Sequence, residues 1–294
     1  MQIAEFDRRL LPSLTRLINA HTATVLPGFV LTDEQVAYAI AHGGKLWNLH
    51  YPDDREVFTT RTVCILEHSE VVAAAQWLIP SSRTQVCTLL WLVAQPSKPI
   101  PLRTLLHLID KQVKTSGHGG IEQGRFAFGI GWFGIPSTWP HLLSGLREAG
   151  YQQVESWLLM HGALQDHSGI LDDESFKLYW DMNRPSLEWD LSVYLDEQKL
   201  GEARVWGVPP QLEDCPSAND WITIEWIGVR PEYRRQGIGR RLFGEQMRFH
   251  AKHGVHYVAL WVEQKNTAAR KLAESFQLAY GPQLCVMAKQ RQDV

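Results

Sequence analysis

The sequence has few cysteines, no long apolar run and no surplus of basic residues, and each absence excludes a class of protein. Its 294 residues include four cysteines and no Cys-x-x-Cys pair, so neither a disulfide framework nor a zinc knuckle is indicated. The 29 basic residues do not exceed the 32 acidic ones, whereas binding to a phosphate backbone requires a basic excess. We therefore expect no nucleic-acid partner.

Membrane insertion and export are not indicated either. No stretch reaches the roughly 18 apolar residues of a membrane-spanning helix. Glu5 and Asp7 precede any apolar run that could form the core of a signal peptide. We expect a cytoplasmic protein with no membrane partner. Its hydrophobic content of 45% supports a substantial core, and its length suits two domains of roughly 100 to 200 residues each.

The chain does contain a recurring order of predicted elements. In the first half, apolar periodicity predicts helices near 10–20, 33–42, 102–114 and 139–149, and strands near 61–67, 71–78, 87–93, 125–131 and 154–160. In the second half it predicts strands near 191–195, 202–208, 222–229, 257–262 and 284–288, and helices near 236–253 and 267–276. Both halves end in the order βββ-α-β-α-β. We therefore predict an α/β protein with mixed α+β sheets in two tandem domains, residues 1–162 and 163–294.

One loop in the second half has the composition of a phosphate site. The predicted strand 222–229 is followed by Pro231 and then by Arg234-Arg235-Gln236-Gly237-Ile238-Gly239, where a helix is predicted to begin. The first turn of a helix has about four N–H groups without internal partners and carries partial positive charge. Glycines let an anion approach the main chain, and the arginines add charge. The loop therefore indicates a pyrophosphate site.

Two other phosphate motifs do not fit this loop. A P-loop needs Gly-Lys-Ser/Thr, but Gly239 is followed by two arginines. A dinucleotide fingerprint needs a third glycine where Leu242 stands. A purely structural reading, an arginine-rich helix start with incidental glycines, stays open.

The run from Val229 to Gly239, VRPEYRRQGIG, resembles the coenzyme A loop of the GNAT superfamily of N-acetyltransferases. The segment that starts at Leu260, with Asn266 and Ala269, resembles that family's L-x-V-x-x-x-N-x-x-A segment. The resemblance implies acetyl-CoA as cosubstrate and two strands that separate so that the pantetheine arm can pair with the main chain. The coenzyme-binding residues that it implies are Ile227, Gly228, Val229, Arg234, Arg235, Gln236, Gly237, Ile238, Gly239, Arg240 and Asn266.

Two carboxylates are candidates for the base that takes a proton from the acceptor ammonium. Glu225 matches the position where many members of the family carry their base, and strict alternation along the strand places it on one face with Ile227 and Val229, away from Ile224. Glu263 follows the next strand, at a place that a branch of the family uses. A solvated, non-catalytic Glu225 stays open.

A general acid is harder to identify. The family's usual tyrosine is replaced here by Ala273. Tyr280, Tyr257 or Tyr233 could substitute, although an ordinary core or rim role is open for each. Thiolate departure could also proceed without a protein acid, because main-chain groups can stabilise charge that develops on the carbonyl oxygen.

No metal site is expected. His250 and His253 share a helix face, but Gly254 interrupts the helix before His256. Histidines close to a helix C-terminus are favoured by the helix dipole.

The first domain is predicted to be a degenerate copy. Leu146 to Gly150-Tyr151 resembles the family's closing Gly-aromatic pair, but the loop equivalent to the coenzyme loop is Gln95-Pro96-Ser97-Lys98-Pro99-Ile100-Pro101. It has no glycine, and its three prolines have no N–H donor. We expect this domain to bind no coenzyme. The segment 129–134 could flex at a cleft or simply end a strand.

The resemblance implies an enzyme that moves an acetyl group from acetyl-CoA directly to a primary amine in a ternary complex. A small-molecule amine is the first choice of acceptor and a peptide or protein N-terminus the second, for a monomer or homodimer. The acidic loop 209–216 could attract a cationic amine or be an ordinary surface loop. The alternative is a non-catalytic acyl-CoA-binding sensor or interaction module, because the tyrosine is missing and one loop is degenerate.

Overall fold

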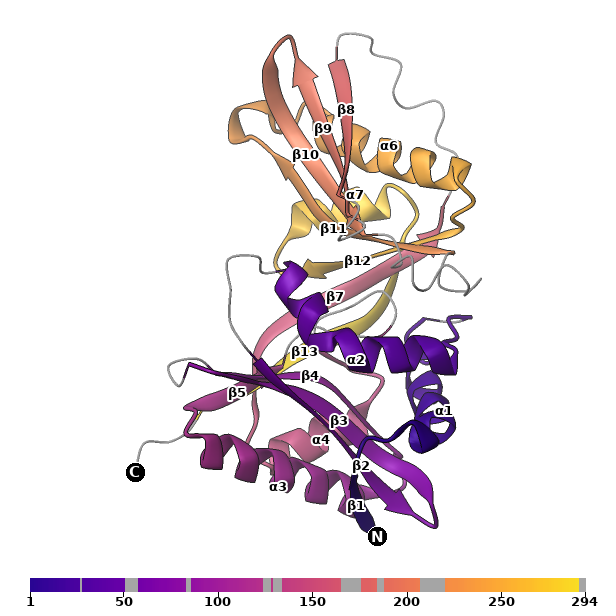
Figure 1. The fold of residues 1–294 in the computed structure, drawn as a ribbon. Coiled ribbons are helices and arrows are strands. Elements are labelled where there is room, and N and C mark those ends of the chain that lie inside the picture. The colour runs from indigo at the N-terminus through magenta and orange to yellow at the C-terminus, as the bar shows by residue number, and fades with distance from the viewer. Residues whose placement is uncertain are drawn as a thin grey trace. The chain divides into compact units, whose positions relative to one another are not determined.

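The computed structural model describes residues 1–26, 28–50, 58–82, 86–123, 128, 134–164, 176–183, 188–206 and 220–290 (Figure 1). Its internal contacts divide the chain into two compact units. The first unit contains Met1–Trp157 and the chain from Pro282 onward, and the second contains Leu158–Gly281.

The first unit begins with strand β1 (Gln2–Glu5), a 3-10 turn η1 (Arg8–Leu10) and helices α1 (Leu11–Thr22) and α2 (Asp33–His50). Strands β2 (Phe58–Glu67), β3 (Glu70–Pro80) and β4 (Cys87–Ala94) follow, and then α3 (Pro99–Ser116). The unit continues with β5 (Gly120–Gln123), β6 (Ile135–Pro136), α4 (Pro140–Glu148) and the first part of β7 (Gln152–Ala163).

Neighbouring strands from β1 to β4 pair antiparallel, and β4 pairs with β5 in parallel. All eight residues of β4 are buried, and β3 is buried over most of its length. Consecutive buried residues require cover on both faces of a sheet. Helices α1 and α3 both pack on β3 and β4, and Figure 1 shows α2 and α3 on opposite sides of these strands.

The second unit contains the end of β7 and four further strands, β8 (Phe176–Asn183), β9 (Glu188–Leu195), β10 (Gln198–Trp206) and β11 (Trp221–Val229). A 3-10 turn η3 (Pro231–Tyr233) leads to α6 (Ile238–Lys252), β12 (Tyr257–Glu263), α7 (Thr267–Glu274) and the start of β13 (Ala279–Gln290). Neighbouring strands from β8 to β11 pair antiparallel, whereas β11 and β12 pair in parallel.

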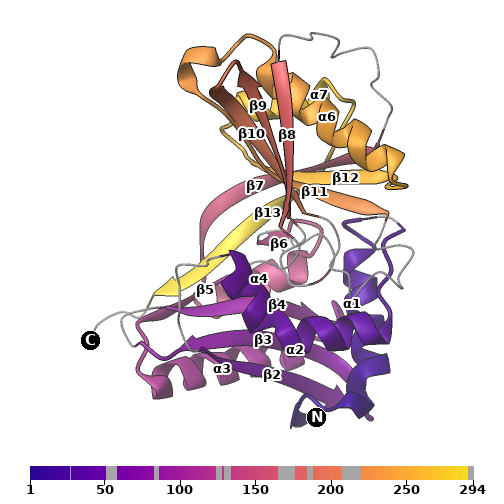
Figure 2. The same ribbon diagram turned by 45° about the horizontal axis from the view of Figure 1, so that its top comes forward.

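One face of this second sheet is covered by α6 and α7. Phe243 and Met247 of α6, Ala273 of α7, and Val205 and Ile224 of the strands belong to one buried cluster. A second cluster joins the start of α6 to the inner residues of β9 and β10. Figure 2 shows α6 running alongside these strands.

Most predicted elements form close to their predicted bounds, with some differences. The helix predicted at 33–42 continues to His50, and β1 and β6 were not predicted. Strand β8 was not predicted, although its residues largely alternate between apolar and polar. The strand predicted at 125–131 falls almost entirely outside the described residues, and the strand in that region is β5. The helix predicted from Gln236 begins two residues later, at Ile238, because Gly237 has a left-handed conformation.

The C-terminal strand is the main departure from the predicted domains 1–162 and 163–294. Ala288 to Gln290 of β13 pair with β5, and Leu284 and Cys285 pair with β6. Residues 282–290 therefore complete the sheet of the first unit, although they come last in the chain. Periodicity could not indicate this pairing, because an apolar strand can join any sheet that offers a free edge.

Gly120 provides a test of this pairing. A Cβ atom there would lie 2.6 Å from the carbonyl oxygen of Lys289, whereas a Cβ at Gly119 would meet no atom within 4 Å. We expect Gly120→Ala to destabilise the first unit by about 1 to 3 kcal/mol because the strands must move apart. Gly119→Ala is the matched control. Chemical denaturation measures the effect, and equal stability of the two variants would contradict the pairing.

Candidate functional site

Strands β11 and β12 separate part of the way along their length. Their parallel pairing runs from Trp221 with Tyr257 to Ile224 with Leu260, while the strands continue to Val229 and Glu263. The separation expected from the sequence is therefore present. It leaves the edge of residues 225–229 that faces away from β10 unused by β12, so a ligand with amide groups could pair there.

A β-bulge lies where the two strands separate. Arg204 of β10 pairs with Trp226, but the next residue, Val205, pairs with Ile224, so Glu225 is the additional residue of β11. A bulge of this kind bends a strand and increases its twist, and bulges are common beside active sites. The bulge therefore places Glu225 at the start of the opened segment.

The bulge also corrects the predicted faces of β11. Strict alternation placed Ile227 on the face opposite to Ile224. In the structure, both pack against the same cluster under α6, because one extra residue shifts the alternation by one. The predicted separation of Ile227 from Ile224 is therefore wrong, and alternation no longer supports the prediction that Glu225 shares a face with Ile227 and Val229.

The loop after β11 presents main-chain N–H groups at the start of α6. Arg235 and Gly237 have positive φ angles of 65° and 81°, so the chain turns twice in the left-handed region before the helix begins. The N–H groups of residues 236–240 donate to no acceptor among the described residues, and the first helical bond is from Arg241 N to Gly237 O. We call residues 234–240 the cradle.

The charge of the cradle is positive. Arg234, Arg235 and Arg240 are exposed, and the Nε of Arg234 donates to the carbonyl oxygen of Val229 at 3.0 Å, which holds that side chain against the end of β11. Arg230 is neutralised by Glu232 at 2.6 Å. Together with the helix dipole, the cradle can hold a phosphate group.

The structure favours glycine at position 237 more than at position 239. A Cβ at Gly237 would meet no atom within 4 Å, so its left-handed backbone is what favours glycine there. A Cβ at Gly239 would lie 3.6 Å from a methyl group of Val229, which is an ordinary contact. Neither glycine is required by crowding within the protein.

Asn266 has a capping role that the sequence resemblance did not indicate. Its side-chain oxygen accepts a hydrogen bond of 3.1 Å from Ala269 N and caps α7. Only its exposed NH₂ group is left for the coenzyme contact that the resemblance implies.

The two candidate bases differ in environment. Glu225 is half-buried, and its Oε2 atom is shielded from solvent. Glu263 ends β12 with a side chain that is 42% exposed and forms an ion pair with Lys265 at 3.3 Å. A base works best where water does not compete for it, so the environment favours Glu225.

Each candidate acid has its own contacts, and Tyr280 is the one whose hydroxyl has a hydrogen bond among the described residues. Ala273, at the place of the family's usual tyrosine, is fully buried in the core. The hydroxyl of Tyr280 donates to Glu274, and this hydrogen bond raises the pKa of the tyrosine. Tyr257 stacks on Trp221 with ring centroids 4.8 Å apart, and Arg230 lies over the ring of Tyr233.

The histidines near the end of α6 are not gathered around one point. His250 is buried and meets Trp189 edge to face, His253 bonds to Phe249 O, and His256 bonds to Asp220. In the part of the chain that the structure describes, no three His, Cys, Asp or Glu side chains are grouped as metal ligands. No helix in that part is both long and apolar enough to cross a membrane. The loop 209–216 and residues 129–133 lie outside the described residues.

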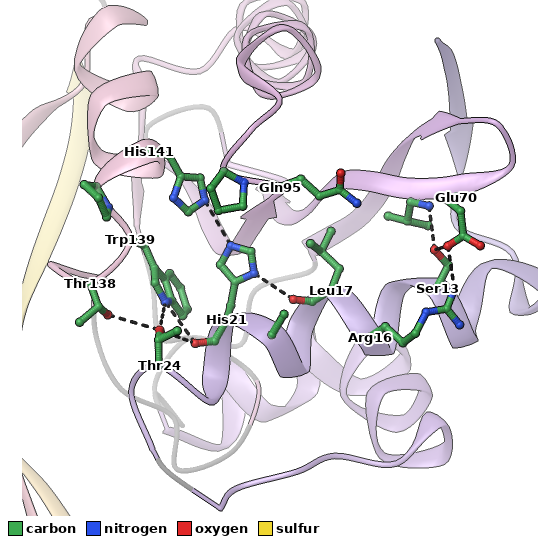
Figure 3. A pocket seen from close by; sticks show the side chains of 14 residues that line it. Ser13, Arg16, Leu17, His21, Thr24, Glu70, Gln95, Thr138, Trp139 and His141 are labelled. Carbon is green, nitrogen blue, oxygen red and sulfur yellow. Dashed lines mark hydrogen bonds and ion pairs between the residues drawn. The ribbon is translucent and has the colours of Figure 1, made fainter.

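The first unit has a pocket of about 510 Å³ that contains none of the predicted site residues (Figure 3). It lies between α1, the start of β3, the loop after β4 and the start of α4. Its polar groups form two sets: Ser13 and Arg16 bond to Glu70 at 2.6 Å each, and His21 faces His141. No sequence signal pointed to this pocket, because α1 and α4 are far apart along the chain.

The hydrogen bonds of the two pocket histidines fit neutral rings. Nδ1 of His21 donates to Leu17 O at 2.9 Å, and Nε2 of His141 lies 2.8 Å from Ala94 O, to which it can only donate. The remaining contact, 3.3 Å between the two Nε2 atoms, then has one donor and one acceptor. Burial lowers the pKa of His21 to about 4 and also lowers that of His141.

Stability should therefore fall with acidification. Burial lowers the pKa of both His21 and His250 from 6.5 to about 4, so the unfolded chain takes up these protons first. The stability from neutral burial is present above pH 6.5 and is lost as the pH falls toward 4, by about 3 kcal/mol per histidine. We expect His250→Phe to reduce the loss between pH 7.5 and 4.5 by roughly 2 to 3 kcal/mol. Denaturation at both pH values measures it, with the exposed His253→Phe as control; an unchanged pH dependence in His250→Phe would contradict the assignment.

Residues 157–277 match the model of the acetyltransferase (GNAT) family. The fold is similar to a tandem GNAT protein from the clavulanic acid biosynthesis pathway, with TM-score 0.70, 10% identity, and coverage of 100% of this chain and 99% of that chain. It is also similar to a GCN5-related N-acetyltransferase from Sphaerobacter thermophilus, with TM-score 0.67, 15% identity, and coverage of 100% and 96%. No curated protein matches the sequence. The predicted α/β fold in tandem GNAT-like form is confirmed.

Proposed function

Because the chain carries a domain of the GNAT acetyltransferase family at residues 157–277, we propose that the protein transfers an acetyl group from acetyl-CoA to a primary amine of a small molecule. The GNAT fold supports acyl-CoA-dependent acyltransferase activity. The observation that carries the proposal is the cradle, where N–H groups without acceptors meet exposed arginines at a helix start, next to a strand edge that β12 leaves unused.

The coenzyme fits these features in one orientation. The diphosphate would accept hydrogen bonds from the N–H groups of residues 236–240, with Arg234, Arg235 and Arg240 supplying charge. The pantetheine arm, which carries two amides, would pair with the main chain of Ile227, Gly228 and Val229. The thioester would then lie toward the bulge at Glu225. Asn266 would contact the coenzyme through its NH₂ group.

The reaction would be a direct transfer. The acceptor nitrogen attacks the thioester carbonyl carbon, the C–N bond forms and the C–S bond breaks. Glu225 takes the ammonium proton, directly or through one water, and the departing thiolate is protonated from solvent. No tyrosine is assigned as the acid: the hydroxyl of Tyr280 is bonded to Glu274, and Tyr257 lies at the paired end of β12, away from the opened segment.

We assign the coenzyme to the second domain alone, in the proposed division at residues 162 and 163. In the first unit, α3 begins with Pro99 and Pro101, which lack N–H donors. A non-catalytic acyl-CoA sensor is the second candidate, and the burial of Ala273 at the usual place of the tyrosine favours it.

Gly237→Asp tests the cradle, with Gly254→Asp as a matched control. Both glycines have left-handed φ angles, 81° and 84°, and open space around the Cβ position, so the two substitutions add the same charge and similar strain. Only Gly237 lies at the start of α6. We expect Gly237→Asp to weaken coenzyme A binding at least about 10-fold through repulsion of the diphosphate, and Gly254→Asp to leave it nearly unchanged. Calorimetry measures both; equal affinities would remove the cradle from the site.

Glu225→Gln tests the base. We expect a loss of turnover on the order of 100-fold, since positioned bases contribute about that much or more, and little change in coenzyme affinity. Release of free thiol from acetyl-CoA with a panel of amines measures turnover, and Glu263→Gln is the comparison. If Glu225→Gln keeps full activity and Glu263→Gln loses it, then Glu263 is the base. Coenzyme binding without transfer to any amine would favour the sensor.

A further inference from the structure

The face of the second sheet that is turned away from α6 and α7 carries an exposed tryptophan. Val205 and Ile224 pack under α6, so Arg204 and Trp226, which pair across the strands, lie on the opposite face. Trp226 is 57% exposed. Single exposed apolar side chains are common on proteins, but tryptophan is enriched among the residues that contribute most to binding.

The ring of Trp226 is held in place by a glycine. A Cβ atom at Gly228 would lie 2.7 Å from Nε1 and 3.1 Å from Cε2 of the indole, so the ring lies against the main chain of residue 228. Any other residue there would displace it. Trp226 and Gly228 therefore form a flat apolar platform one residue beyond Glu225.

Charged side chains of both signs lie around this platform. Glu202 pairs with Gly228 across the strands, and Asp190 pairs with Arg204. The carboxylate of Asp190 neutralises Arg204 through contacts of 2.8 and 3.2 Å. Glu202 in turn forms an ion pair with Lys199. With Glu225 at the bulge, three carboxylates and two basic groups lie around the platform, and the remaining negative charge favours a cationic ligand.

We propose that this platform is the subsite for the acyl acceptor, and that the acceptor is a primary ammonium compound with a planar, apolar body. The body stacks on the indole of Trp226, and the ammonium lies toward Glu225, which removes its proton before attack. The proposal rests on the proposed acetyl transfer and adds the class of acceptor.

Four small molecules test separately the contribution of the ring and that of the ammonium group. Phenethylamine has both the ring and the ammonium, and butylamine has the ammonium alone. Phenethyl alcohol and hydrocinnamate keep the ring but carry no charge and a negative charge, respectively. At saturating acetyl-CoA, we expect phenethylamine to have a KM about 10-fold below that of butylamine. The alcohol should compete weakly with phenethylamine, and hydrocinnamate should not compete.

Trp226→Ala should raise the KM for phenethylamine about 10-fold, leave that for butylamine within twofold and leave coenzyme affinity unchanged. Trp226→Phe should restore most of the preference. Tyr179→Ala is the matched control, because Tyr179 is 55% exposed and lies on β8, away from β11; its kinetics should equal those of the unaltered protein. An unchanged ratio of the two KM values in Trp226→Ala would overturn the proposal.

The two proposals fail in different ways. Absence of coenzyme A binding in calorimetry would remove the proposed function, and the platform is then tested by direct binding of phenethylamine and its loss in Trp226→Ala. If the coenzyme binds but no amine is acetylated, phenethylamine binding to the coenzyme complex, with and without Trp226→Ala, tests whether the platform binds the amine. Phenethylamine that binds no better than butylamine, or equally well to Trp226→Ala, would overturn the platform and leave the coenzyme site intact.

Discussion

The separation of β11 and β12 is the constraint on which the candidate site depends. Parallel pairing ends at Ile224 and Leu260, and the bulge at Glu225 lies immediately after it. A β-strand whose edge is unpaired carries unsatisfied N–H and C=O groups, and these must find water or a ligand. The same bulge turns Trp226 to the open face while Ile224 and Ile227 stay under α6. One extra residue thus sets the strand edge, the carboxylate and the exposed indole together.

The helix starts that correspond in the two units, those of α6 and α3, differ in their donors and charge. In the second unit, a left-handed loop frees the N–H groups at the start of α6 and surrounds them with arginine. In the first, α3 starts with prolines, and the corresponding strand end borders an uncharged histidine pair in a small pocket. Phosphate requires donors and positive charge, so only the second arrangement suits a nucleotide-bearing coenzyme.

The platform of Trp226 and Gly228 is the feature of this chain that bears on its acceptor. An indole lying over a glycine, with Glu202 on the neighbouring strand and Glu225 at the bulge, is the surface that we propose for a cation with an apolar body. It would give the acceptor a fixed orientation relative to Glu225, and orientation of the two reactants accounts for much of what such an enzyme can contribute when no cofactor chemistry is involved.

The sequence by itself determined the glycine and arginine loop at the start of α6, the order of most elements and the tandem fold, because helix starts, glycines and apolar periodicity act over a few neighbouring residues. Only the tertiary structure decided three other features: the bulge that overturned the predicted faces of β11, the placement of residues 282–290 in the first unit, and the meeting of His21 with His141. Each depends on which strand or helix becomes a neighbour in space. That choice is made by pairing and packing over the whole chain, and a local pattern carries no record of it.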